Sequence, residues 1–460
     1  MFHLKKSTLL DTISGIQPQY FCLAAALGLE FLLMAFRGYG FYFMENYMIV
    51  PTMLFLGTIF GHKISRVAQR QLWLCLGFFF WFFIAQTLHY MMDLEVRSVG
   101  LFTSVYLLAF PFASLTQDGK KQWGLKLTSV ACIGAALILV ALSCLMMLDV
   151  LPGFLKPHIY WDGARLQAFW HPNICAVIFL MGIAFSLYCF TQSSRKWCKT
   201  LFIAIVIILF FFMTLTNSRT SLFLCSCMFG GLLFFRIYNG SWKRFLIGTV
   251  VALVVILLLF NSAQAVFQAH YDARLAKFVA QAEEMAAQGI PSSEDSPITL
   301  DYKGDLALKT DAGQLSLAIN MPSLNGRTNL WAAGIQALMN NPTALVLGVD
   351  TPENFLTEHW GTSIAHSHNS WLDTLIGLGI PGLLFALIFT GIAVWHIWTT
   401  CWGKNCSLDQ KIIAMLLLCL MGTGFLEPYL FFTTIFYHYT DFIFFLCLGY
   451  LILWRSEKNV

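Results

Sequence analysis

Long apolar runs dominate the chain, and they restrict its fold more than any other feature. A helix needs about 20 apolar residues to cross the hydrocarbon core of a membrane, and many runs here reach that length. Only 11% of the 460 residues are charged, against about 25% in soluble domains. An ordinary soluble enzyme and a disordered chain are therefore excluded. The runs are continuous rather than alternating, which argues against a β-barrel. The sequence predicts an all-α polytopic membrane protein.

The apolar runs predict about twelve transmembrane helices. They lie near residues 18–36, 40–60, 71–91, 98–116, 127–148, 170–191, 200–216, 218–236, 245–262, 369–399, 411–427 and 436–454.

Lysine and arginine predict the orientation, because cytoplasmic loops carry an excess of both. With the N-terminus inside, most of the 28 basic residues fall in inner segments. Lys5, Lys6, Lys120 and Lys121 are examples. We therefore expect both termini in the cytoplasm. A net charge of +4, scattered between apolar runs, does not favour nucleic-acid binding.

The cysteines indicate no disulfide-bonded outer domain. All 13 fall in spans or inner loops, and the long outer loop has none. Cys401 and Cys406 have neither a second cysteine pair nor a histidine partner, so a zinc site of the usual pattern is not predicted there. We predict no metal and no cofactor.

The topology predicts three regions: transmembrane helices 1–9 in residues 1–262, one large extracytoplasmic loop in 263–368, and transmembrane helices 10–12 in 369–460. Within the loop, residues 264–288 have the pattern of an amphipathic helix. Residues 289–325 have the composition of a linker, and 327–340 predict a second helix that stops near Asn341-Pro342.

Four unusual residues share the outer face on this topology: Arg165 before span six, Arg219 between spans seven and eight, Arg327 in the loop, and His368 at the start of span ten. Each also has a structural interpretation. Arg165 could anchor at the interface, Arg219 could belong to a turn, Arg327 could cap a helix, and His366 and His368 could be interfacial polar residues. His171 and Asn173 could start a helix. Other polar residues in the outer halves of spans could be structural partners of the arginines; these are Glu30, Glu427, His438 and Asp441.

Taken together, these residues favour chemistry on a lipid diphosphate. Arginine binds phosphate oxygens with two parallel hydrogen bonds, and a neutral histidine can accept a proton from a hydroxyl near pH 7. Arginines would stabilise the leaving charge while histidine activates an attacking alcohol. No Asp-rich metal site and no phosphate-binding glycine loop is visible.

Three segments around these residues resemble the O-antigen ligase and polymerase superfamily of bacterial cell envelopes. They are Asn217-Ser-Arg219-Thr, Gly326-Arg-Thr-Asn-Leu-Trp331 and, most specifically, His366-Ser-His368-Asn369-Ser-Trp running into Gly377-Leu-Gly-Ile-Pro-Gly382. The segment from Arg165 to Asn173 also resembles the family. The resemblance covers roughly residues 160–390.

The resemblance implies a GT-C-like bundle and metal-independent transfer of a glycan from undecaprenyl diphosphate, at the outer face of the bacterial inner membrane. It implies His368 as the catalytic residue and Arg219, Arg327 and Arg165 as contacts of the donor diphosphate. His366, Asn369, Trp331 and Asn173 would support them.

The acceptor remains open at this stage. A ligase would use a lipid A–core hydroxyl, a polymerase would extend the lipid-linked glycan, and a protein O-oligosaccharyltransferase would modify protein. Two other classes are a transporter of the same anionic lipids and a scaffold whose outer loop binds an envelope partner. Clustering of the polar residues outside, rather than at the membrane midplane, argues against the transporter.

Overall fold

We describe the fold from a computed structural model, which defines most of the chain. The described residues are 18–36, 66–92, 107, 109–113, 122–148, 150, 159–162, 165–168, 172–237, single positions and short stretches between 243 and 276, 324–349, 355–356, 366–403, 405–427, 430–431 and 438–456. By its contacts, the chain divides into a first unit of residues 1–131 and 328–460 and a second unit of residues 132–327.

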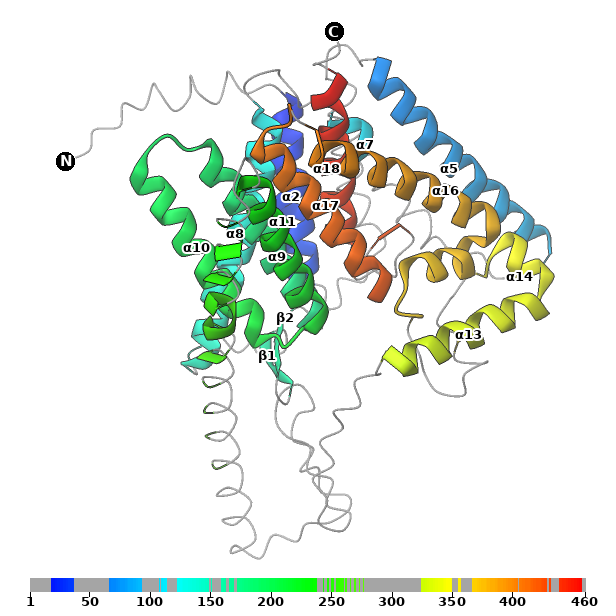
Figure 1. The fold of residues 1–460 in the computed structure, drawn as a ribbon. Coiled ribbons are helices and arrows are strands. Elements are labelled where there is room, and N and C mark those ends of the chain that lie inside the picture. The colour runs from blue at the N-terminus through cyan, green and yellow to red at the C-terminus, as the bar shows by residue number, and fades with distance from the viewer. Residues whose placement is uncertain are drawn as a thin grey trace, which may run out of the picture. The chain divides into compact units, whose positions relative to one another are not determined.

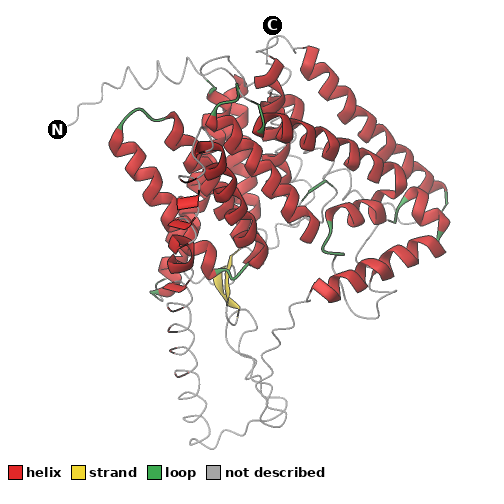
Figure 2. Ribbon diagram, in the orientation of Figure 1, coloured by secondary structure: helices red, strands yellow, loops and turns green. Residues whose placement is uncertain are grey.

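Helices make up nearly all of the described structure, and one short β-hairpin accompanies them (Figure 2). The helical architecture confirms the all-α prediction for the described helices, whereas the hairpin was not predicted. The elements are α2 (Pro18–Phe36), α5 (Arg66–Met91), α7 (Ala109–Phe112), α8 (Trp123–Met147), β1 (Ile159–Asp162), β2 (Arg165–Ala168), α9 (Pro172–Gln192), α10 (Lys196–Leu215), α11 (Arg219–Ile237), α13 (Leu324–Asn340), α14 (Pro342–Leu347), α16 (Ser370–Cys401), α17 (Leu408–Leu426) and α18 (His438–Ser456).

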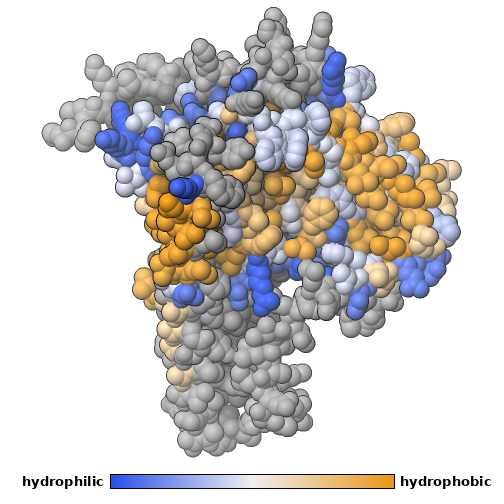
Figure 3. All heavy atoms as spheres, viewed as in Figure 1, coloured by the Kyte–Doolittle hydropathy of each residue, from blue (hydrophilic) through white to orange (hydrophobic). Residues whose placement is uncertain are grey.

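Six helices among the described residues are long and apolar enough to cross a membrane: α5 from Gln69, α8, α9, α10, α16 and α17. Shorter apolar helices occupy the expected spans at α2, α11 and α18. On the face shown in Figure 3, hydrophobic side chains cover the helix flanks and hydrophilic ones gather toward the helix ends. The expected span at 40–60 and most of the one at 98–116 lie outside the described residues. The expected span at 245–262 is described only in part, with helix at 254–259, so twelve spans stay a prediction.

The second unit is built around α9, which is buried along most of its length. Helices α10 and α11 pack against it (Figure 1). Gly182 permits close packing, because a Cβ there would lie 2.7 Å from Ala136 Cβ and 2.8 Å from Leu209 Cδ1. An apolar helix without a polar face is expected to be buried in this way. The hairpin β1–β2 leads into α9, and Leu166 of β2 is fully buried.

The first unit centres on α16, α17 and α18 (Figure 1). Helix α17 lies against both of the others and is largely buried. Phe389 of α16 meets the ring of Phe445 in α18, with 5.4 Å between centroids, and the ring of Phe110 in α7 at 5.7 Å. These edge-to-face contacts fix how α16, α18 and α7 meet.

Helix α16 is broken one quarter of the way along its length. Gly379 has φ 67° and ψ −170°, and Pro381 cannot donate a backbone hydrogen bond to the preceding turn. Other groups satisfy the exposed carbonyls: the Trp81 indole donates to Leu378 O at 3.1 Å, and Val349 N donates to Ile376 O at 2.6 Å. The break therefore separates a short first segment of α16, residues 370–378, from a long apolar second segment.

Candidate functional site

The structure distributes the predicted site residues over both units. Trp331, His366, His368 and Asn369 belong to the first unit, and Arg165, Asn173, Arg219 and Arg327 to the second. Convergence of the arginines with His368 on one diphosphate therefore stays a prediction.

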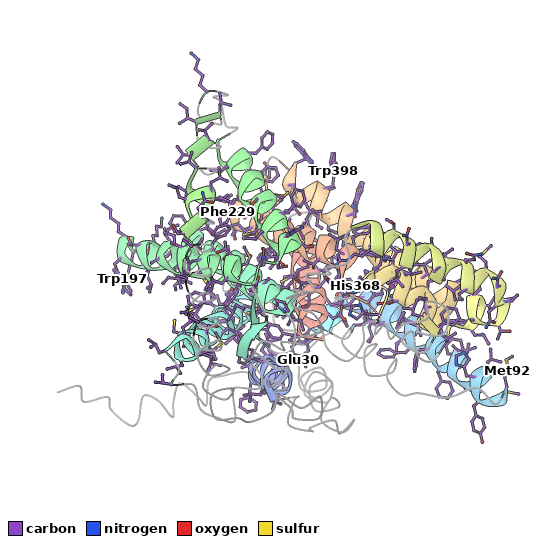
Figure 4. The ribbon with its side chains drawn as sticks, turned by 90° about the horizontal axis from the view of Figure 1, so that it is seen from below. Glu30, Met92, Trp197, Phe229, His368 and Trp398 are labelled. Atoms are coloured by element: carbon purple, nitrogen blue, oxygen red, sulfur yellow. The ribbon has the colours of Figure 1, made fainter. Side chains whose placement is uncertain are left out.

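A histidine–carboxylate pair forms the centre of the site in the first unit. His368 Nδ1 lies 3.1 Å from Glu427 Oε2. The Glu427 side chain is only 2% exposed, whereas that of His368 is 23% exposed. Among the described residues, the contact of the His368 ring that involves a carboxylate is made through Nδ1 and not through Nε2. Figure 4 shows His368 within the first unit, away from the rim where Met92 and Trp398 project.

Backbone geometry holds His368 in an unusual conformation. Its φ is +59°, which is uncommon for a residue other than glycine. The preceding amide, Ser367 N, donates to Asp373 Oδ1 at 2.8 Å, and Ser367 Oγ donates to Asn369 O at 3.1 Å. His368 N donates to His366 Nδ1 at 3.3 Å. Strained backbone of this kind persists only where neighbouring bonds fix it, and it often marks a functional site.

The start of α16 is bonded to the end of α17, which explains why His368 meets Glu427. Asn369 caps α16 by accepting from Leu372 N at 2.9 Å, and its Nδ2 donates to Phe425 O at 3.2 Å. Ser370 Oγ donates to Glu427 O at 3.0 Å and accepts from Leu430 N at 3.0 Å. Asn369 thus joins the start of α16 to the end of α17, and its supporting role in the site stays a prediction.

Trp331 holds the histidine segment from α13. Its indole Nε1 donates to Ser367 O at 2.8 Å. The apolar face of α13 packs on a cluster that includes Leu338, Leu356 and Ile376. The sequence prediction of a helix ending near Asn341 is confirmed. Arg327 precedes Trp331 by one helical turn, so the two share a face of α13.

Arg219 opens α11 and is exposed. A tight turn precedes it: Asn217 has φ 50°, and Ser218 Oγ donates to Ser221 Oγ at 3.2 Å. The positive end of a helix dipole lies at the N-terminus, where a basic side chain is unfavourable for stability. Arg219 therefore does not stabilise α11 through the helix dipole, and its contact with a diphosphate stays a prediction.

Arg165 lies before α9, as predicted, and belongs to strand β2, which pairs antiparallel with β1. Its register partner across the hairpin is Asp162. Asn173 is half-buried at the second position of α9. Since α9 and α10 are antiparallel neighbours, the start of α9 and the turn before Arg219 lie at the same end of the second unit. His171 lies outside the described residues.

Glu427 was predicted to be a structural partner of an arginine, whereas it contacts His368. The signal was present, because both were placed at the outer end of neighbouring spans. Asp373 was missed; a carboxylate five residues after His368 inside a predicted span was the available signal.

Asp441 accepts from Phe431 N at 2.9 Å and so holds the segment between α17 and α18. Glu30 is buried in α2, and the His438 side chain lies outside the description.

His366 completes a compact group of potential metal ligands. One ligand atom from each of His366, His368 and Glu427 lies within 4.8 Å of the other two. The rings of the two histidines meet edge to face, with 4.3 Å between centroids. This group was not expected from the sequence, which predicted no metal.

These features define a class of protein: a polytopic helical membrane protein with a histidine–carboxylate pair at the start of a broken span. Residues 203–387 match the family model described as O-Antigen ligase, which confirms the resemblance to the O-antigen ligase and polymerase superfamily. The match contains Arg219, Arg327 and His368. It supports a glycosyltransferase-like enzyme that acts on lipid-linked glycans in a bacterial membrane. No curated protein matches the chain.

Proposed function

We propose that the chain transfers a glycan from undecaprenyl diphosphate to an acceptor hydroxyl of the lipid A–core type, at the outer face of the bacterial inner membrane. The observation that carries this proposal is the pair of His368 and Glu427. His368 lies inside residues 203–387, which match the O-antigen ligase family, and Glu427 lies beyond the end of that match. Both termini would lie in the cytoplasm. The transfer itself would need no metal.

His368 is the general base in this proposal. Its Nε2 takes the proton of the acceptor hydroxyl while the acceptor oxygen bonds to the anomeric carbon of the donor sugar. The bond from that carbon to the diphosphate oxygen breaks, and undecaprenyl diphosphate leaves with the electron pair. Glu427 orients the imidazole through Nδ1 and stabilises the imidazolium that forms, as the carboxylate does in other catalytic histidine pairs.

The arginines stabilise the leaving diphosphate. A guanidinium binds two phosphate oxygens at once and stays charged at any working pH. Arg219 and the helix N-terminus that it opens would both attract an anion. Arg327 would act from the first turn of α13, and Arg165 from β2.

A polymerase is the alternative, because the same donor and base would serve a second lipid-linked glycan as acceptor. Protein O-glycosylation and transport of the lipid-linked glycan receive less support, since a fixed base beside a buried carboxylate serves covalent transfer rather than passage.

A transfer assay tests the proposal and separates its two main forms. Purified protein receives a diphosphate-linked oligosaccharide, with lipid A–core in one tube and no added acceptor in another. Product on lipid A–core that is lost in His368→Ala and kept in His396→Ala, a control on the same helix, indicates the ligase. Longer lipid-linked chains without added acceptor indicate the polymerase. Full transfer by His368→Ala contradicts the role of the base.

A further inference from the structure

The group of His366, His368 and Glu427 has the composition and geometry of a metal site. Two imidazoles and one carboxylate with an open position are a ligand set that proteins use for Zn²⁺. His366 and Glu427 are buried, while His368 is part-exposed and offers the way in. Around tetrahedral zinc, nitrogen and oxygen ligands lie about 3.3 Å apart. The three ligand atoms are within 4.8 Å of one another, so modest side-chain rotations would bring them to a common ion.

A buried negative charge beside the group favours a cation. Asp373 is 1% exposed, and its Oδ1 accepts from the amide of Ser367, which lies between the two histidines. Its Oδ2 has no hydrogen-bond partner among the described residues. A buried carboxylate oxygen without such a partner is costly, and a nearby divalent ion would reduce that cost.

We propose that this group is an inhibitory Zn²⁺ site, in which His366, His368 and Glu427 hold the ion and water completes the coordination. Binding itself follows from the ligand geometry. Inhibition rests on the proposed function, because it requires His368 to be the base.

Inhibition follows whichever nitrogen of His368 binds the ion. If Nε2 binds, the lone pair that should accept the acceptor proton is occupied. If Nδ1 binds in place of its contact with Glu427, then Nε2 carries the remaining proton of the neutral imidazole and has no lone pair to offer. In both arrangements Glu427 is a ligand of the ion as well. No atom of the substrate is needed for the ion to bind.

Metal binding is tested directly on the purified full chain, first stripped with a chelator. Equilibrium dialysis against Zn²⁺ should give one tight site per chain. His366→Gln and Glu427→Gln should each weaken that site by more than about 10-fold, since even outer-shell changes cost 10- to 100-fold. Cys401→Ser with Cys406→Ser is the matched control and should keep it. Thermal unfolding of each variant without metal checks that it is folded.

Cobalt distinguishes this site from cysteine sites without any variant. Co²⁺ held by nitrogen and oxygen shows visible d–d bands without the intense near-ultraviolet band of thiolate ligation. A thiolate band, or zinc binding lost only in the cysteine variant, would overturn the proposal. Mg²⁺ should neither compete for the site nor inhibit, because it prefers all-oxygen octahedral sites.

Turnover separates this proposal from the proposed function. Chelator-treated protein should transfer glycan, and stoichiometric Zn²⁺ should stop it, with recovery after a second chelation. If the protein binds zinc but the metal-free protein transfers no glycan, the result counts against the proposed transfer and still supports the zinc site. Transfer that is unaffected, or increased, by a fully occupied zinc site would overturn the inhibition.

Discussion

Glu427 is the residue whose role depends most on tertiary structure. It follows the last residue of α17, 59 positions after His368. The two residues meet because the start of α16 is hydrogen-bonded to the end of α17. The sequence could place both at one membrane face, since neighbouring spans alternate in direction. It could not choose the partner of His368, because several carboxylates were available at that face. The predicted base itself, and its neighbour Asn369, were visible in the sequence motif.

Glu427→Gln should lower kcat by about 100- to 10,000-fold, the usual contribution of general acid–base catalysis. The amide can still accept a hydrogen bond from Nδ1 but carries no charge to stabilise the imidazolium. KM for the acceptor should change little, because the carboxylate is buried behind the histidine. Steady-state kinetics measure both constants. A raised KM with an unchanged kcat would instead indicate a role in acceptor binding.

Arg219→Lys and Arg327→Lys test the diphosphate contacts. An ammonium keeps the charge but cannot form two parallel bonds to a phosphate, so we expect kcat/KM for the donor to fall about 10- to 100-fold in each. Arg70→Lys, at an exposed position of α5, is the matched control and should leave transfer unchanged. Unaltered kinetics in both site variants would assign the two arginines to surface roles.

At the scale of the element, the break in α16 could not be predicted from the sequence, although the helix itself could. The range of the helix was predicted to within a few residues, because its apolar run is long. The Gly377–Gly382 segment was recognised only as a motif. The structure explains the glycines. Gly348 and Gly379 both have positive φ. A Cβ at Gly348 would overlap the backbone of Gly377, and a Cβ at Gly379 would overlap the backbone of Val346. The β1–β2 hairpin was missed because its four-residue strands give almost no periodic signal.

Gly379→Ala should destabilise the protein by about 2 kcal/mol or more. Alanine at positive φ costs about 1–2 kcal/mol, and its Cβ would also overlap the carbonyl of Val346. Gly391→Ala is the control on the same helix, since a Cβ there meets no atom within 4 Å. Thermal unfolding in detergent should show a clear loss for position 379 and little change for position 391. Equal unfolding temperatures would mean that the break relaxes into continuous helix.

At the scale of the whole molecule, the described part of the chain is mostly apolar helices, and the candidate residues His368, Glu427 and Arg219 lie at helix ends. Hydropathy predicted most of these helices, since membrane spans need only length and apolarity to be recognised. The division into two units could not be predicted, because it depends on which helices pack together. It passes through α8 and α13 rather than through a loop.

The predicted orientation has a direct test in cells. A green fluorescent protein joined after Val460 should fluoresce, because it folds in the cytoplasm. Alkaline phosphatase joined after Thr216, at the end of α10, should be active, because it needs the oxidising outer compartment. The reverse pattern would place His368 and Arg219 at the cytoplasmic face and remove the lipid-linked donor from the proposal.

The burial of α9 separates two steps in the biogenesis of the protein. Before the helices associate, α9 is surrounded by lipid; afterwards protein covers most of it, and both surroundings are equally apolar. Its insertion into the bilayer therefore depends on hydropathy, whereas its final association depends on shape, above all at Gly182. A Gly182→Leu chain should enter the membrane at normal yield and then fail to assemble. Such a chain would be a substrate for membrane proteases rather than for cytoplasmic chaperones.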